Sequence, residues 1–143
     1  MKLGEFKRNV INLGFEEEDV FDETPSLFID ALNRARMLFY ASVEKGFKKE
    51  FVKKNPDDIE DEELIEVIVS TKPPKKVDED TTDDTEIDID EEKTSLLQLL
   101  TAYFVWLDDD ERKAVMYYNT YQEQLSMYLQ RRGSVEVIGG YDI

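Results

Sequence analysis

The stretch Ser95–Leu125, SLLQLLTAYFVWLDDDERKAVMYYNTYQEQL, decides the fold of this chain. The segment from about 91 to 107 is apolar nearly all round, which at this length is typical of a helix at the centre of a protein and not of a membrane span. The residues that follow predict a second helix from about 109 to 132, with one apolar face made by Ala114, Tyr117, Tyr121, Leu125 and Tyr128. The C-terminal half is therefore predicted to be two packed helices joined by an acidic turn.

The acidic turn, Asp108–Glu111, allows two interpretations. Carboxylates are the ligands that Mg²⁺ and Ca²⁺ prefer, so the run could hold a metal ion. The run lacks the alternating ligands and central glycine of a calcium loop, however, and Asp108 followed by Glu111 fits an N-terminal helix cap. We favour the cap, with Asp108 and Glu111 as its residues, and expect no metal.

Two further helices are predicted in the N-terminal third. Residues 2–13 carry Leu3, Phe6, Val10 and Leu13 at helical spacing, followed by Gly14. Thr24-Pro25 is a helix start signal, and that helix should run to about Lys45, with Gly46 ending it. Its predicted apolar stripe is Phe28, Leu32, Ala35, Phe39 and Val43, widened by Ile29 and Leu38.

The central region predicts a small β-element. Residues 63–73, ELIEVIVSTKP, read as a strand because they are rich in β-branched residues, alternate in part, and are terminated by Pro73-Pro74. Residues 86–90, EIDID, alternate strictly and are expected to return as the second strand, with 75–85 as a mobile acidic loop at the tip. Residues 47–53, FKKEFVK, could either extend the preceding helix or form an edge strand. The fold class is thus mainly α: a four-helix bundle-like body with a small acidic β-hairpin insert between helices 2 and 3 and an extended C-terminal tail.

Composition narrows the function classes. The 143 residues suit a single domain spanning 1–143. The absence of cysteine and histidine removes thiolate chemistry, the commonest general base and the commonest transition-metal ligand. No nucleophile with a partner base and no phosphate-binding glycine loop is visible, so we expect neither an enzyme nor a cofactor. No segment has the apolar length of a membrane span or a signal peptide, so no membrane partner is expected.

The net charge of −16 is concentrated in one insert. Residues 57–92 carry 17 acidic and 3 basic side chains, a balance of −14, while the rest of the chain is close to neutral. Such a segment repels phosphates and disfavours nucleic-acid binding through charge neutralisation.

The order of these elements resembles the small head–tail connector (neck adaptor) proteins of tailed phages and prophages of Gram-positive bacteria. The most specific similarity is the apolar helix ending AYFVWLDDD followed by the helix with YYNTYQ; the opening MKLGEFKRNVINLGF and the helix FIDALNRARMLFY are similar more loosely. The resemblance implies a structural virion protein that is assembled in the host cytoplasm. It implies a ring of about a dozen copies beneath the portal, which lines the DNA channel and presents the surface for a tail or stopper protein.

The residues themselves suggest where such contacts would lie. The face of the last helix that is not used for the core carries an apolar surplus, and the C-terminal arm, 134–143, could add a strand to a neighbour. The hypothetical oligomer or portal interface is Val115, Met116, Tyr118, Val135, Val137, Ile138, Tyr141 and Ile143. Carboxylates would let DNA slide past without sticking, and the hypothetical channel belt is Asp78, Glu79, Asp80, Asp83 and Asp84.

A second function class remains open. The acidic segment could imitate DNA, in which case the chain would be a small acidic inhibitor that occupies a basic partner protein. Neutralising the acidic segment would abolish the activity of an inhibitor but would leave the ring assembly of an adaptor intact.

Overall fold

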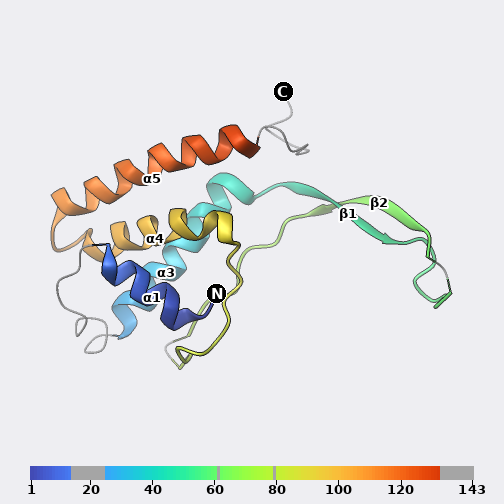
Figure 1. Ribbon diagram of the computed structural model, residues 1–143, viewed down its shortest axis with the longest axis horizontal. Helices are drawn as coiled ribbons and strands as arrows, with labels where there is room; N and C mark the ends of the chain where they lie inside the picture. Colours follow the sequence, from blue (N-terminus) through green and yellow to red (C-terminus); the bar gives the residue numbers. More distant parts are fainter. Residues whose placement is uncertain (14–24, 61, 79, 133–143) are drawn as a thin grey trace.

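The computed structural model describes residues 1–13, 25–60, 62–78 and 80–132, and it is mainly helical, as predicted (Figure 1). A helical body carries a two-stranded antiparallel hairpin between its second and third described helices. The elements in chain order are α1 (Leu3–Asn12), α3 (Pro25–Phe39), η1 (Tyr40–Glu44), β1 (Phe47–Lys53), β2 (Leu64–Ser70), α4 (Glu91–Trp106) and α5 (Glu111–Arg132).

Helix α4 is the centre of the body, and α1, α3 and α5 all pack against it. Its buried residues point in every direction around the helix, and they are Leu96, Leu97, Leu99, Leu100, Thr101, Ala102 and Val105. Thr101 is fully buried but satisfied, because its hydroxyl donates a 2.6 Å hydrogen bond to the Leu97 carbonyl one turn earlier. The predicted central helix is confirmed.

The N-terminal helices bury the faces that their periodicity predicts. The α1 residues Leu3, Phe6 and Val10 are buried, and the Phe6 ring lies 6.2 Å from that of Phe28 in α3. All five residues of the stripe predicted for the second helix are buried, four in α3 and Val43 in η1, and Ile29 widens that stripe as expected. Leu38 is an exception, since its side chain is exposed. Gly14 and Thr24 lie outside the described residues.

The end of the second helix differs from a regular α-helix. Residues Tyr40–Glu44 form a π-helical turn, in which the Lys45 N–H donates to the Tyr40 carbonyl at 2.7 Å. Gly46 then ends the helix, as expected, with a φ of 152° that residues with a Cβ rarely adopt. The chain leaves the body at this point and enters β1.

The hairpin contains one of the predicted strands but not the predicted partner. Strand β2 lies within the predicted 63–73 segment, and it pairs with β1, so the ambiguous segment 47–53 is a strand. The prediction that 86–90 is the second strand is wrong: this segment makes a single bridge between Glu86 and Lys2, and it buries Ile87 against the body. Alternation in EIDID therefore reflects one buried side of an irregular segment and not a sheet.

The acidic loop is likewise not at the hairpin tip. Residues 54–63 connect the strands, whereas the 75–85 segment runs back along the helical body and buries Val77. Its described residues are tied down, since the Leu3 N–H donates to the Thr85 carbonyl and the Gly4 N–H to the Asp83 carbonyl, each at 2.9 Å. These carbonyls satisfy free N–H groups at the start of α1, so part of the segment expected to be a mobile loop is hydrogen-bonded to the helical body.

The aspartate run is a helix cap, but shifted by two residues from the prediction. The first α5 bond runs from the Ala114 N–H to the Asp110 carbonyl, and the Asp110 carboxylate accepts a 3.2 Å hydrogen bond from the Lys113 N–H. Asp110 is therefore the N-cap, and Asp108 lies in the preceding turn. Glu111 is the first helical residue, close to the positive end of the helix dipole.

Lys113 also lies over the Trp106 ring, 4.0 Å from its centre, and so closes the turn between α4 and α5.

Candidate interaction surfaces

The hairpin is an arm that leaves the helical body, as Figure 1 shows, with its connecting turn far from the helices. Its root is firmly held. The Tyr40 hydroxyl donates to the Thr71 carbonyl at 3.1 Å, the Gly46 N–H donates to the Thr71 hydroxyl oxygen at 2.9 Å, and the Thr71 N–H donates to the Gly46 carbonyl at 2.9 Å. The arm is thus fixed in direction where it starts, although no described element covers either of its faces.

Large apolar side chains on this arm are exposed to solvent. On one face the exposed fractions are 50% for Phe47, 69% for Phe51, 61% for Leu64 and 58% for Ile68. The strand register places each of them opposite a polar residue, so that the four form a zigzag along the hairpin. An isolated two-stranded hairpin is marginally stable in water at best. Exposed apolar side chains on such an element are typical of a surface that binds a partner.

The backbone bonds at the two ends of the hairpin determine which groups point outward. The Lys54 N–H donates to the Glu63 carbonyl at the tip end, and the corresponding bond at the root joins Thr71 and Gly46. Hydrogen-bonded and non-bonded pairs alternate along an antiparallel ladder. In the observed register the non-bonded positions are therefore Phe47, Lys49, Phe51 and Lys53 with their partners Ser70, Ile68, Glu66 and Leu64. Their N–H and C=O groups face away from the partner strand and form two open edges.

The outer face of α5 carries part of the predicted interface. Val115 and Met116 are exposed, by 46% and 65%, and remain available for a partner. Tyr118 is placed differently: its ring lies 4.9 Å from that of Tyr103 in α4 and 5.9 Å from that of Tyr121, and the Gln122 amide donates to its hydroxyl. Tyr118 is therefore partly used by the core. The arm residues Val135, Val137, Ile138, Tyr141 and Ile143 lie outside the described residues.

The predicted acidic belt is an exposed strip beside the start of α1. Asp78, Asp80, Asp83 and Asp84 are all exposed, and Glu79 lies outside the described residues. Asp83 approaches α1 so closely that a Cβ at Gly4 would come within 2.8 Å of the Asp83 Cβ. Lys7 lies 3.9 Å from the Asp83 carboxylate, an exposed contact of little energetic weight. The belt is thus a set of carboxylates on a backbone held by the helical body.

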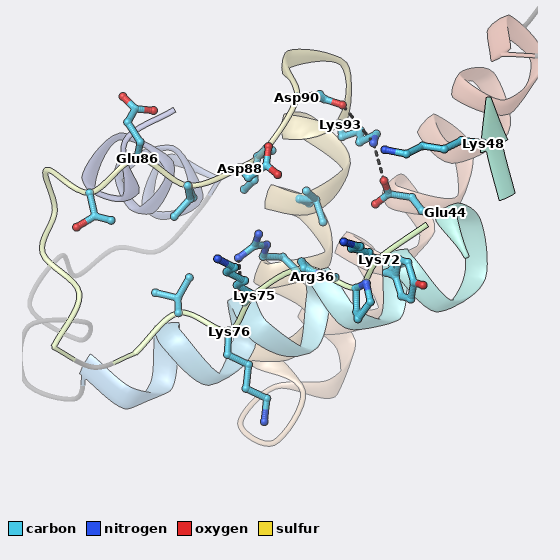
Figure 2. Close-up of a pocket in the computed structure, with 18 of the residues that line it drawn as sticks. Arg36, Glu44, Lys48, Lys72, Lys75, Lys76, Glu86, Asp88, Asp90 and Lys93 are labelled. Carbon is cyan, nitrogen blue, oxygen red and sulfur yellow. Dashed lines mark hydrogen bonds and ion pairs between the residues drawn. The ribbon is translucent and has the colours of Figure 1, made fainter. Parts of the chain in front are cut away.

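A pocket of about 810 Å³ lies between the root of the hairpin and the returning acidic segment (Figure 2). Arg36 of α3, only 7% exposed, forms part of its wall and donates a 2.9 Å hydrogen bond to the Lys75 carbonyl. Burial lowers the pKa of Arg36, while the charges of Asp88 and Glu44 oppose this shift. Arg36 therefore fastens the returning chain to α3.

The opposite side of this pocket is closed by an ionic cluster. Lys93 of α4 lies 2.6 Å from Glu44 and 3.2 Å from Asp90, as the dashed lines in Figure 2 show. Burial opposes the charge of Lys93, but the hydrogen bonds and charges of these two carboxylates outweigh it and raise the lysine pKa. On this side of the pocket Lys93, Glu44 and Asp90 are committed to one another, an arrangement typical of structural ion pairs.

Neither a metal cluster nor a membrane span is present in the described part of the chain. Within residues 1–13, 25–60, 62–78 and 80–132, no three carboxylates gather closely enough to hold a metal ion. No helix among them has the length and apolar character needed to cross a membrane.

Sequence reasoning missed the most exposed surface, which is the hairpin arm. A signal for it lies in the composition of 47–54, where two phenylalanines stand among four lysines. Periodicity alone does not decide between helix and strand for residues 47–53. The roles of Asn33 and Arg36 in holding the acidic segment could not be read from periodicity, because both lie on a helix whose apolar stripe predicts only the core contact.

Comparison of the chain with protein-family models, with curated proteins and with solved structures found no match.

Proposed function

We propose that this chain is a structural subunit of a phage neck: a head-to-tail adaptor that forms a ring beneath the portal. The observation that carries the proposal is the hairpin arm, whose apolar side chains remain uncovered in the single chain. A subunit built to assemble gains the missing burial from its neighbours, at roughly 25 cal/mol for each Å² removed from water. The resemblance of 95–125 and of the N-terminal helices to neck proteins supplies the kind of assembly.

Two further surfaces fit this role. Val115 and Met116 on α5 lie on the outside of the helical body and offer a second contact for a neighbouring copy or the portal. The belt carboxylates Asp78, Asp80 and Asp84 lie on a segment that the body holds in place, which would allow them to face a DNA channel without adhering to the phosphates.

The function is tested by mixing the purified protein with a phage portal ring and imaging the mixture by electron microscopy. We expect a collar of copies on one end of the portal. Removing residues 134–143 should abolish docking while far-UV circular dichroism stays unchanged, since the described helices end at Arg132. A protein that shows no affinity for any component of the capsid vertex would contradict the proposal.

The fixed position of the belt also favours one alternative, an acidic inhibitor that occupies a basic protein. Carboxylates on a backbone that is already hydrogen-bonded to the body lose less conformational entropy on binding than carboxylates on a mobile loop. They can therefore bind a fixed arrangement of cationic groups more tightly. Replacing Asp78, Asp80 and Asp84 with asparagine separates the two functions. An inhibitor would lose its partner, whereas an adaptor would keep its ring and dock to the portal normally.

A further inference from the structure

The two strands of the hairpin arm carry opposite charge. The β1 segment 47–54 has four lysines and one glutamate, a net charge of +3, and the β2 segment 62–70 has three glutamates and no cation, a net charge of −3. Part of this charge is neutralised inside the hairpin, where Lys49 lies 3.3 Å from Glu66 and Lys54 lies 3.3 Å from Glu63. The second pair is solvent-exposed and the first is half-buried. Lys53 on β1 and Glu62 before β2 lie outside these pairs, so the two edges keep opposite signs.

Both edges are also unpaired in the described part of the chain, where the sheet consists of β1 and β2 alone. The outward N–H and C=O groups belong to the residues of the apolar zigzag and to the charged residues between them. An open edge of this kind is a template for pairing with another strand. Opposite charge favours pairing the β1 edge with a β2 edge and disfavours β1 with β1 or β2 with β2.

A shift of two residues makes these edges complementary side chain by side chain. Within one hairpin, Phe51 faces Glu66 and Lys49 faces Ile68, so every apolar residue of the zigzag is mismatched. If the β1 edge meets the β2 edge of another copy with the register moved by two, the opposed pairs become Phe47 with Ile68, Lys49 with Glu66, and Phe51 with Leu64. Apolar residues then face apolar residues, and the lysine faces a glutamate.

We propose that the hairpin arms of neighbouring copies join in this way, the β1 edge of one copy pairing antiparallel with the β2 edge of the next. The partner is a second copy of this chain, and the contact is head-to-tail, so a joined pair keeps one free β1 edge on one copy and one free β2 edge on the other. Contacts of this type either close into a ring or continue as a filament. The inference rests on the proposed function for the closed ring, and it adds which strands form the junction and in which register.

The absence of cysteine from the chain allows a direct test of this junction. Two single variants of the full chain, F51C and L64C, are mixed and mildly oxidised. In the proposed register these positions form a hydrogen-bonded pair, with Cα atoms about 5.5 Å apart, which a disulfide can bridge. We expect a heterodimer on a non-reducing gel, whereas F51C alone should give little dimer because β1 edges do not meet. Thiol labelling of each variant confirms that both cysteines are accessible.

The matched control mixes F51C with V67C, which lies on β2 but has its side chain on the opposite face. The junction is overturned if F51C with L64C yields no more heterodimer than this control. Raising NaCl from about 0.1 M to about 1 M, where the screening length falls from about 10 Å to about 3 Å, should lower the rate of cross-linking several-fold. The test needs no portal, so the two proposals can fail separately. A negative cross-linking result removes the junction and leaves the neck function standing. Cross-linking without docking to the portal keeps the junction and contradicts the neck function.

Discussion

Asn33 and Val77, 44 residues apart in the chain, hold each other through two hydrogen bonds. The Asn33 amide nitrogen donates to the Val77 carbonyl at 2.9 Å, and the Val77 N–H donates to the Asn33 amide oxygen at 2.8 Å. The side-chain amide thus stands in for a neighbouring strand and satisfies both backbone groups of a buried residue. This pair, together with Arg36 and Lys75, holds the acidic segment on α3.

Replacing Asn33 with alanine should therefore loosen the acidic segment. The change leaves the two Val77 backbone groups without partners in a partly buried place, which should cost on the order of 1–3 kcal/mol in the free energy of unfolding. Urea denaturation measures this loss, and amide hydrogen exchange should show faster exchange at Val77. Asn119→Ala on the exposed side of α5 is the control and should have little effect. Equal stability of the two variants would contradict the role assigned to Asn33.

The helices of this fold are predictable from the sequence because their signals are local. The apolar periodicity of 95–125, the proline at position 25 and Gly46 each act within a few residues, and all three appear in the structure. Strand pairing depends on contacts that are distant in sequence. Residues 86–90 alternate as well as a strand does, yet their alternation is satisfied by burying Ile87 on the helical body, and no local signal distinguishes the two cases.

The acidic segment 75–85 likewise could be predicted only in part from the sequence. Its composition is that of a solvated loop, and its carboxylates are indeed exposed. Its backbone nevertheless contacts the helical body, because one valine is buried and because Asn33, Arg36 and the start of α1 offer hydrogen-bond partners. Composition describes the side chains of such a segment, whereas its order depends on partners elsewhere in the chain.

Gly46 should be required for the direction of the hairpin arm. Its φ of 152° is unfavourable for any residue with a Cβ, although no atom lies within 4 Å of the position that a Cβ would occupy. Gly46→Ala should therefore cost about 1–3 kcal/mol through backbone strain alone. Urea denaturation checks this loss, with the adjacent Lys45→Ala as the control, since Lys45 has an ordinary φ of −64°. A change in Gly46→Ala no larger than that of the control would show that the root tolerates other conformations.

Stability should fall in alkaline solution as Tyr121 ionises. Burial raises the pKa of Tyr121 from 10.0 to about 12, with the neighbouring Tyr118 adding to the shift. The Tyr121 hydroxyl therefore loses its proton at a lower pH in the unfolded chain than in the folded one. The contribution of the protonated hydroxyl to the free energy of unfolding is complete below pH 10.0 and is lost as the pH rises to about 12. Thermal melts across this range should show a shallower decline for Tyr121→Phe than for the parent chain. Parallel declines would mean that the Tyr121 proton does not contribute.

The exposed part of α5 should matter for assembly and not for folding. Placing glutamate at both Val115 and Met116 puts two charges on a surface that the proposed ring would cover, and each uncompensated buried charge opposes the contact. The double variant should keep the unfolding free energy of the parent chain within about 0.5 kcal/mol, as is usual for exposed positions, while its collar on the portal is lost. Ser126→Glu, about three turns further along the same helix, adds charge at another exposed position and should assemble normally. Sedimentation velocity and electron microscopy give the readout. Normal assembly of the double variant would remove α5 from the interface and leave the hairpin arm as the contact between copies.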